Sequence, residues 1–262
     1  MDTRHPIDTR MPAMLRSGQT LRGVFNGLPS AAIVEMCAYA GFDFIVIDNE
    51  HGSADFETTE NMLRAARASG IVPVVRCLET DISRVLDMGA GAVQIPMVNT
   101  AQHAADLVQQ IRYPAQGRRG SAFSSRAAGY GAFGGDTHTQ RSNDGIALIV
   151  MVETPEGVQN ADAIAVVEGV DAVFVGPNDL AHSMGFGSNW GAPEVQTAIE
   201  RTVRAVAVAG KCAGVLALTP EDEQKYAAWG ARYFASVTTG IFTRALKQAA
   251  QAGRGDAVQL KY

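Results

Sequence analysis

The chain has 262 residues, of which 47% are hydrophobic and 19% charged, and its 22 Lys+Arg against 27 Asp+Glu give a formal net charge of −5. This composition excludes a largely disordered chain. The negative balance argues against nucleic acid or an anionic membrane as the main partner. Apolar runs stay far below the roughly 20 residues that span a bilayer, and three cysteines without a CxxC pair are typical of a reducing compartment. We therefore expect a soluble, cytoplasmic protein.

Eight apolar runs rich in β-branched residues recur along the chain and are predicted to be strands. In chain order these runs are Leu21–Phe25, Phe42–Ile47, Val72–Val75, Ala92–Val98, Ile146–Val152, Ala172–Val175, Ala213–Leu218 and Tyr233–Val237. Amphipathic stretches with helical periodicity lie between them, at 55–69, 100–111, 156–167, 193–209 and 220–229. Apolar strands that alternate with helices indicate a parallel sheet covered by helices, and eight such units favour a closed (β/α)8 TIM barrel of the α/β class. An open doubly wound sheet is the competing fold, but no GxGxxG sequence follows the first strand.

The whole chain, residues 1–262, is predicted to form one barrel domain with three added segments. Residues 1–19 form an amino-terminal extension. Residues 112–145 are glycine-rich and polar, and are predicted to be a long loop that serves as a lid or an interface arm. Residues 241–251 are predicted to be an extra helix that packs on the barrel or on a neighbouring subunit. The GxGxxG sequence at 129–134 follows no strand and opens no helix, so it does not predict a nucleotide site.

Charged side chains are predicted to converge at the carboxyl ends of four strands, which form the active face of such a barrel. The second strand runs into Asp48 and His51, the third ends at Arg76, the fifth ends at Glu153, and the sixth is followed by Asp179. Each residue alone is compatible with a helix cap or a surface ion pair. Their arrival from four separate strands favours a functional site.

The residue types at this rim indicate metal-assisted proton chemistry. Glu153 and Asp179 offer hard oxygen ligands that suit Mg²⁺ or Mn²⁺ better than zinc. A histidine has an ordinary pKa near ~6.5, so His51 can move a proton at neutral pH, with Asp48 three residues earlier to orient it. Arg76 is predicted to face a carboxylate or an enolate, and an internal ion pair with one of the acids stays open. No lysine ends a strand, which disfavours Schiff-base chemistry.

The sequence resembles the HpcH/HpaI aldolase family, the metal-dependent class II pyruvate aldolases that act on 4-hydroxy-2-oxo acids. The resemblance covers about residues 16–249 in family order. It is carried by Asp48–Gly52 (DNEHG), Val74–Arg76 (VVR), Ile95–Val98 (IPMV), Val152–Thr154 (VET) and Gly176–Leu180 (GPNDL). It departs from the family at Met151, where glutamine is common, and at Gly240, where aspartate is common.

The resemblance implies a reaction and a ligand set. It implies reversible cleavage to pyruvate and an aldehyde through a pyruvate enolate, with Mg²⁺, Mn²⁺ or Co²⁺ held by Glu153 and Asp179. It implies that Arg76 holds the pyruvyl oxygens and that the backbone amides of Asn178 and Asp179 receive the carboxylate. His51 would be the acid and base.

Further expectations follow from the same resemblance. Asp87 matches an acid that family members place near the catalytic histidine. The pocket wall near Leu216 and the predicted lid at 112–145 are expected to select the aldehyde. The macrophomate synthase branch adds oxaloacetate decarboxylation as a second reaction of the same enolate. Assembly through carboxyl-terminal helices, commonly as a hexamer, is also implied.

Two other functions stay open at this stage. One is a citryl- or malyl-CoA-type lyase, which shares the fold and the metal acids, although the rim lacks an evident basic cluster for the CoA phosphates. The other is a non-catalytic barrel that binds oxo acids, against which the presence of Asp48 and His51 counts.

Overall fold

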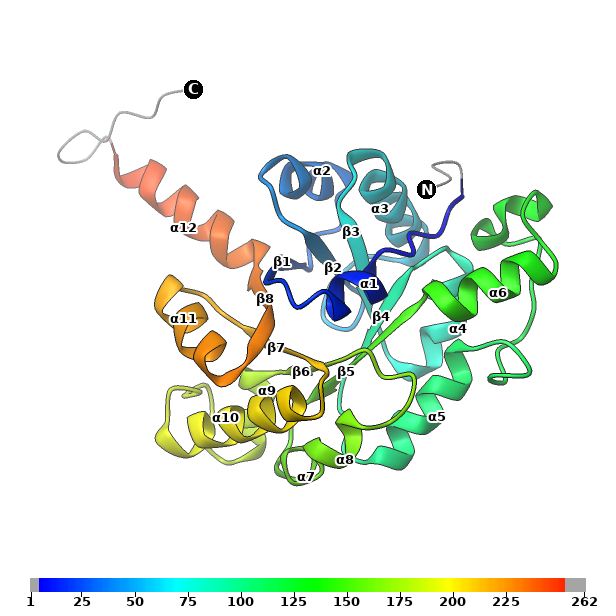
Figure 1. Cartoon of the computed structure of the whole chain (residues 1–262). Helices are drawn as coiled ribbons and strands as arrows, with labels where there is room; N and C mark the ends of the chain where they lie inside the picture. Colours follow the sequence, from blue (N-terminus) through cyan, green and yellow to red (C-terminus); the bar gives the residue numbers. More distant parts are fainter. Residues whose placement is uncertain (1–4, 253–262) are drawn as a thin grey trace.

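A computed structural model of the chain describes residues 5–252 and shows a closed barrel in which eight parallel strands follow the order β1 to β8 (Figure 1). The strands are β1 (Leu21–Asn26), β2 (Phe44–Asp48), β3 (Val72–Arg76), β4 (Ala92–Ile95), β5 (Ala147–Val152), β6 (Ala172–Val175), β7 (Cys212–Leu216) and β8 (Ala231–Val237). The α-helices are α1 (Met11–Arg16), α2 (Ala31–Tyr39), α3 (Phe56–Ser69), α4 (Ile82–Asp87), α5 (Ala101–Ile111), α6 (Asp136–Gly145), α7 (Pro155–Gln159), α8 (Ala161–Ala165), α9 (Pro177–Ser183), α10 (Pro193–Val208), α11 (Pro220–Trp229) and α12 (Thr238–Gln251). Two 3₁₀ helices are η1 (Glu79–Asp81) and η2 (Arg126–Gly131). The predicted (β/α)8 barrel is confirmed, with all eight predicted strands present.

The barrel interior is filled by aromatic and aliphatic side chains, so the barrel is not a pore. The rings of Phe44 and Tyr233 stack with centroids 4.2 Å apart, and Phe174 meets Tyr233 edge-on at 5.8 Å. A Cβ atom at Gly214 would lie only 2.5 Å from the Tyr233 ring, so this position has to be a glycine for the ring to fit. A second core lies between the strands and the helices. Because the middle of the barrel is closed, ligands have access only at its ends.

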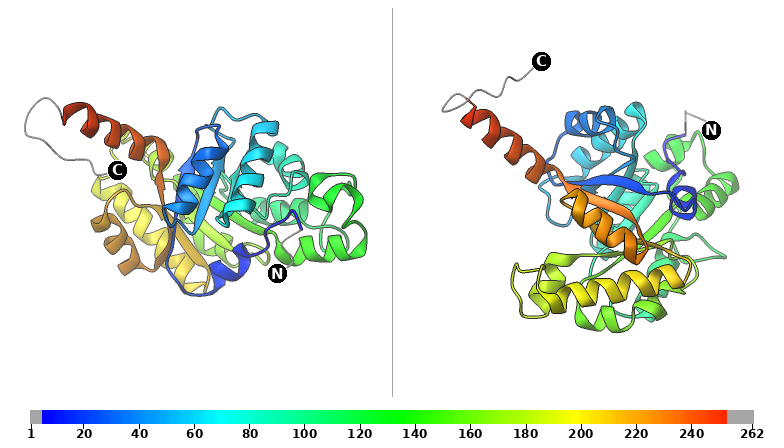
Figure 2. Two further views of the ribbon diagram at one scale, coloured as in Figure 1. Left: turned by 90° about the horizontal axis from the view of Figure 1, so that it is seen from above. Right: turned by 60° about the vertical axis from the view of Figure 1, so that its left-hand side comes forward.

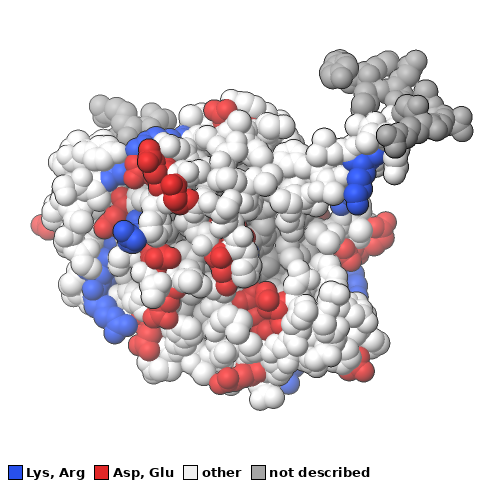
Figure 3. Space-filling model, turned by 180° about the vertical axis from the view of Figure 1, so that it is seen from behind, with Lys and Arg blue, Asp and Glu red and all other residues white. Residues whose placement is uncertain are grey.

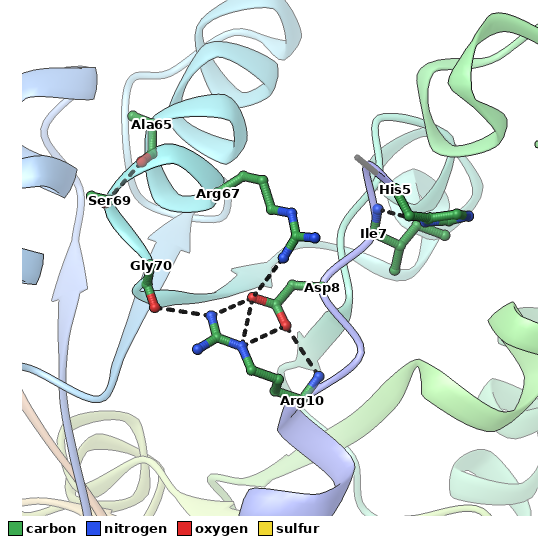
Figure 4. A network of polar contacts seen from close by, with 8 residues as sticks. All are labelled: His5, Ile7, Asp8, Arg10, Ala65, Arg67, Ser69 and Gly70. Carbon is green, nitrogen blue, oxygen red and sulfur yellow. Dashed lines mark hydrogen bonds and ion pairs between the residues drawn. The ribbon is translucent and has the colours of Figure 1, made fainter. Parts of the chain in front are cut away.

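The amino-terminal extension closes one of these ends. Helix α1 packs Met11 and Leu15, which are 0% and 2% exposed, against the interior core. Before the helix, Asp8 is buried and accepts a hydrogen bond from Arg10 Nε at 2.9 Å, while Arg10 Nη2 donates to the carbonyl of Gly70 at 2.9 Å (Figure 4). The amino ends of the strands are therefore covered, and the carboxyl ends remain for a site.

Residues 112–145 contain η2 and α6 rather than one long loop, and they connect α5 to β5. They therefore lie at the amino end of the barrel. Arg126 Nη1 donates to the carbonyl of Met88 at 2.6 Å, and Arg119 Nη2 donates to Asp87 Oδ1 at 2.9 Å, which joins the segment to the end of α4. Since barrel enzymes bind substrate at the opposite end, this segment does not cover the site of its own chain, and the prediction of such a lid is wrong.

The predicted helix at 156–167 is divided into α7 and α8. The division falls at Asn160, whose backbone leaves the helical region (φ −98°, ψ 7°) and whose side-chain amide donates to the carbonyl of Asn99 at 2.8 Å. This bond joins the α7–α8 junction to the loop that follows β4.

Helix α12 projects away from the barrel in every view (Figures 1 and 2). Its first residue, Thr238, is buried, whereas Ile241 and Leu246 are 37% and 69% exposed. The helix predicted at 241–251 is thus confirmed and begins three residues earlier. Its start is attached to the barrel, where Thr238 Oγ1 donates to Asn26 Oδ1 at 3.1 Å, and the rest of the helix projects away from it. Within residues 5–252, every helix is too short or too polar to cross a membrane.

Candidate active site

A cavity of about 330 Å³ opens at the carboxyl ends of the strands. Among the residues that line it are seven that the sequence predicts for the site: Asp48, His51, Arg76, Glu153, Asn178, Asp179 and Leu216. Figure 3, which views the molecule from the side opposite to Figure 1, shows acidic atoms around the centre of this face and basic atoms on the projecting α12. A larger hollow of about 790 Å³ at the amino end, around Arg112 and Asp171, contains none of the predicted site residues.

Arg76 is held in a fixed orientation by Asp48. The two residues are Cα partners on the neighbouring strands β3 and β2. Arg76 Nε donates to Asp48 Oδ1 at 2.9 Å and Nη2 donates to Oδ2 at 2.5 Å, while the guanidinium lies 4.9 Å from the centre of the Phe25 ring. Burial lowers the pKa of Arg76, but the hydrogen bonds and charge of Asp48 outweigh it, so the net pKa is raised. The internal ion pair that the sequence left open is therefore present, and it keeps Arg76 charged at the cavity wall.

Asp48 acts on His51 through the backbone rather than through the imidazole ring. Oδ1 of Asp48 accepts hydrogen bonds from the backbone N–H of Glu50 at 3.1 Å and of His51 at 3.2 Å. The His51 ring extends outward with its side chain 63% exposed, and its Nε2 lies 3.8 Å from Glu50 Oε2. The predicted contact between the Asp48 carboxylate and the His51 imidazole is therefore not formed. Asp48 instead fixes the turn from which His51 reaches the mouth of the cavity.

Glu50 is a functional candidate that the sequence reasoning missed. Its Oε2 lies 3.1 Å from Arg76 Nη1, so the carboxylate lies between Arg76 and His51. Burial raises the pKa of Glu50, although the nearby charges of Arg76 and His51 oppose this. The sequence feature that could have identified Glu50 is its position between Asp48 and His51 in the DNEHG motif.

Glu153 is a buried carboxylate at the end of β5, with 2% exposure. Its Oε2 accepts a hydrogen bond from the backbone N–H of Met97 at 2.9 Å. A Cβ atom at position 176 would lie 2.2 Å from its Oε1, so Gly176 leaves the space that this oxygen occupies. Burial raises the pKa of Glu153 to about 7; the Met97 hydrogen bond opposes that shift and the charge of Asp179 adds to it. The ionised form is therefore costly here unless a positive charge lies close to it.

The donor set fits a hard divalent cation. Two carboxylates, from Glu153 and Asp179, line the same cavity, and the charge of Asp179 acts on Glu153. Among residues 5–252 no group of three or more His, Cys, Asp or Glu side chains is placed to enclose a metal ion. Two carboxylates with open positions are what Mg²⁺-type ions use when water and substrate oxygens complete their coordination.

Comparison with known proteins defines the family. Residues 21–244 match the family described as HpcH/HpaI aldolase/citrate lyase. The chain belongs to the HpcH/HpaI aldolase family. It is 40% identical over 237 residues to 2-keto-3-deoxy-L-rhamnonate aldolase of Salmonella gallinarum (88% of each chain) and 39% identical over 247 residues to hydroxypyruvate/pyruvate aldolase of Delftia acidovorans (93% of this chain, 90% of the relative). The crystal structure of a family member from Burkholderia cenocepacia J2315 superposes with a TM-score of 0.90 at 34% identity, covering 95% of this chain and 100% of that one.

Family membership confirms the resemblance read from the sequence. The chain is a carbon–carbon lyase of the pyruvate aldolase type, in a family of metal-dependent class II enzymes.

Asp87 does not join the other predicted residues. It is the last residue of α4, at the amino end of the barrel, and its carboxylate accepts a hydrogen bond from Arg119. It is absent from the described lining of the cavity. Its predicted position beside His51 therefore does not hold within this chain, because a residue at the end of a barrel helix lies at the end opposite the site.

The buried charge of Glu153 makes a prediction about stability. The pKa is about 7 in the folded state against 4.5 for an ordinary glutamate, so the folded protein binds the proton more tightly. In metal-free protein the tighter binding of this proton stabilises the folded state at low pH. The free energy of unfolding therefore falls by roughly 3 kcal/mol as pH rises from about 4.5 to about 7. Glu153→Gln removes the titration, so the variant gains stability relative to wild type between pH 5 and pH 8.

Urea unfolding in EDTA at several pH values measures this difference. Wild type and Glu153→Gln share every other titrating group, so only the difference between the two curves matters. Curves that stay parallel from pH 5 to pH 8 would contradict the assignment.

Proposed function

We propose that the chain catalyses the reversible aldol cleavage of a 4-hydroxy-2-oxo acid to pyruvate and an aldehyde through a pyruvate enolate. The observation that carries this proposal is the shared cavity at the carboxyl end of the barrel. The carboxylates of Glu153 and Asp179 line it, together with the His51 imidazole and the Arg76 guanidinium with its partner Asp48. The atoms balance without a redox partner, because the C3–C4 bond breaks, C4 leaves as the aldehyde carbon, and the electron pair enters the enolate.

Glu153 and Asp179 would hold Mg²⁺, Mn²⁺ or Co²⁺, which when bound supplies positive charge to the carboxylate and 2-oxo oxygens of the substrate. The first turn of α9, with the backbone amides of Asn178 and Asp179, borders the same cavity and would receive the substrate carboxylate. These groups together orient the 2-oxo acid end of the substrate.

His51 would accept the proton of the C4 hydroxyl group, directly or through a water. The imidazole lies at the cavity mouth and is exposed enough to meet the far end of the substrate. Glu50 Oε2, 3.8 Å from His51 Nε2, would stabilise the imidazolium that results. The same histidine can return a proton so that the enolate becomes pyruvate.

Arg76 would stabilise the negative charge that develops on the enolate. Its guanidinium is fixed by Asp48 before substrate arrives, so little reorganisation is needed as the bond breaks. Leu216, together with Phe25 and Val237, would form the apolar part of the wall.

The substrate class that fits both the site and the relatives is a 2-keto-3-deoxy sugar acid, a polyhydroxylated 4-hydroxy-2-oxo acid. The relatives' names give no support for oxaloacetate decarboxylation or for an acyl-CoA substrate, and the proposal is restricted to aldol cleavage. A panel of 4-hydroxy-2-oxo acids, with pyruvate release coupled to lactate dehydrogenase, tests it. Release of pyruvate by wild type and its loss in His51→Ala is the expected result. Binding of oxo acids without pyruvate release from any of them would favour the non-catalytic barrel instead.

We also propose that the protein forms a homo-oligomer through α12, with a hexamer the state that the family resemblance suggests. The helix carries Ile241 and Leu246 into solvent, and a hollow of about 470 Å³ is lined by Phe42, Leu218 and Phe234, beside β8 and β1. Exposed apolar side chains on a projecting helix and a partly apolar hollow on the same chain favour contact between copies.

The variant Ile241→Glu/Leu246→Glu should therefore have a smaller assembly mass than wild type in light scattering coupled to gel filtration. Val208→Glu is the matched control, because Val208 is an 89% exposed apolar residue on α10, away from α12. A wild-type protein that elutes as a monomer would contradict the proposal.

A further inference from the structure

Met97 has an unusual backbone that its own side chain does not explain. It lies between β4 and α5 and has φ +58°, a left-handed conformation that is uncommon for any residue with a Cβ atom. Its side chain is 47% exposed, so packing does not force the conformation. Residues held in this region cost free energy and persist where the surrounding structure needs the geometry.

The conformation directs the backbone N–H of Met97 to Glu153 Oε2, at 2.9 Å. The two residues that follow are joined to the same part of the chain. The N–H of Val98 donates to the carbonyl of Met151 at 2.9 Å, and Thr154 Oγ1 donates to Asn99 Oδ1 at 2.6 Å. The loop 97–99 is therefore bonded at each of its residues to the end of β5 or to the two residues that follow the strand, on both sides of Glu153.

The two oxygens of Glu153 are consequently not equivalent. Oε2 is committed to the Met97 amide, and Oε1 lies over Gly176, where a Cβ atom would be 2.2 Å away. Gly176 itself lines the cavity. The Met97 hydrogen bond therefore fixes the rotation of the carboxylate.

We propose that Met97 is a positioning residue, whose left-handed backbone holds Glu153 by Oε2 and leaves Oε1 beside Gly176 at the cavity wall, in the orientation in which Glu153 would hold the divalent cation. The proposal rests on the proposed metal site and adds the element that orients it.

Substitutions at position 97 test the backbone rather than the side chain. Met97→Val places a β-branched residue in a left-handed conformation and should displace the amide, whereas Met97→Gly adopts that conformation readily. The measurement is the dissociation constant for Mn²⁺ with initially metal-free protein, by isothermal titration calorimetry. We expect Met97→Val to bind about 10-fold more weakly or worse, and Met97→Gly to stay within about 3-fold of wild type.

Tyr130 provides a matched control. It has φ +56° and is 67% exposed, but it lies in η2, away from the cavity. Tyr130→Val introduces the same backbone conflict and should leave the Mn²⁺ constant within about 2-fold of wild type. If Met97→Val fails to fold, Asn99→Ala is the second variant. It removes the Oδ1 atom of the loop 97–99 that accepts the Thr154 hydrogen bond, and it should also weaken Mn²⁺ binding.

The outcomes separate this inference from the proposed function. If wild type binds no divalent ion, the proposed metal site is wrong. If wild type binds Mn²⁺ and both Met97→Val and Asn99→Ala bind it equally well, or if Tyr130→Val weakens it as much as they do, the positioning role is wrong and the metal site stands.

Discussion

Removal of divalent metal ions with EDTA is expected to lower pyruvate release by about 10³-fold or more. The reason is electrostatic. Asp179, and Glu153 in its ionised form, place negative charge in the cavity where the enolate is expected to develop, and Asp48 offsets part of the charge of Arg76. Without a cation, Arg76 alone would be left to stabilise the charge of the enolate.

The measurement is the lactate dehydrogenase assay on EDTA-treated, desalted enzyme, with Mg²⁺, Mn²⁺ or Co²⁺ added back. Any of these ions that binds should restore the rate in wild type but not in Glu153→Gln. The same variant should be more stable than wild type when both are metal-free, so loss of folding does not account for its loss of activity. Undiminished cleavage in excess chelator would remove the metal from the mechanism.

The barrel could be predicted from the sequence because its strands are buried on both faces. Runs such as Phe44–Asp48 and Ala147–Val152 are buried at every position, so they appear in the sequence as continuous apolar stretches followed by helices. Chain direction then places Glu153 and Asp179 at one end without any knowledge of distances, and the structure places both at one cavity.

Chain direction also contained the information that would have prevented two errors. Asp87 ends a helix, and residues 112–145 run from the end of a helix to the start of a strand. In a (β/α)8 barrel such connections lie at the amino ends of the strands, opposite the site. The glycine-rich composition of 112–145 favoured a lid, but its position between α5 and β5 excluded one for the same chain.

Other features depend on strand register and on contacts between distant segments, which one sequence does not reveal. Asp48 pairs with Arg76 because β2 and β3 align these two residues, and spacing along the chain favoured His51 instead. The contact of Met97 with Glu153 joins residues 56 positions apart through a backbone amide. Every residue except proline has this N–H group, so the residue type at position 97 does not indicate the contact.

Replacing Arg76 with lysine is expected to lower kcat/KM by about 10²–10³-fold, although the charge is conserved. Lysine cannot make the two parallel bonds to Asp48 and also present an N–H to substrate, so the position of the charge is lost while its sign remains. Arg84→Lys is the matched control, because Arg84 also stacks on an aromatic ring, that of Phe56 at 4.4 Å, but lies outside the cavity, and its rate should stay within about 2-fold of wild type. The assay is initial-rate kinetics at saturating Mg²⁺ on the best substrate of the panel. A lysine variant with wild-type kcat/KM would mean that Arg76 serves only to neutralise Asp48, and the stabilisation of the enolate would then rest on the cation alone.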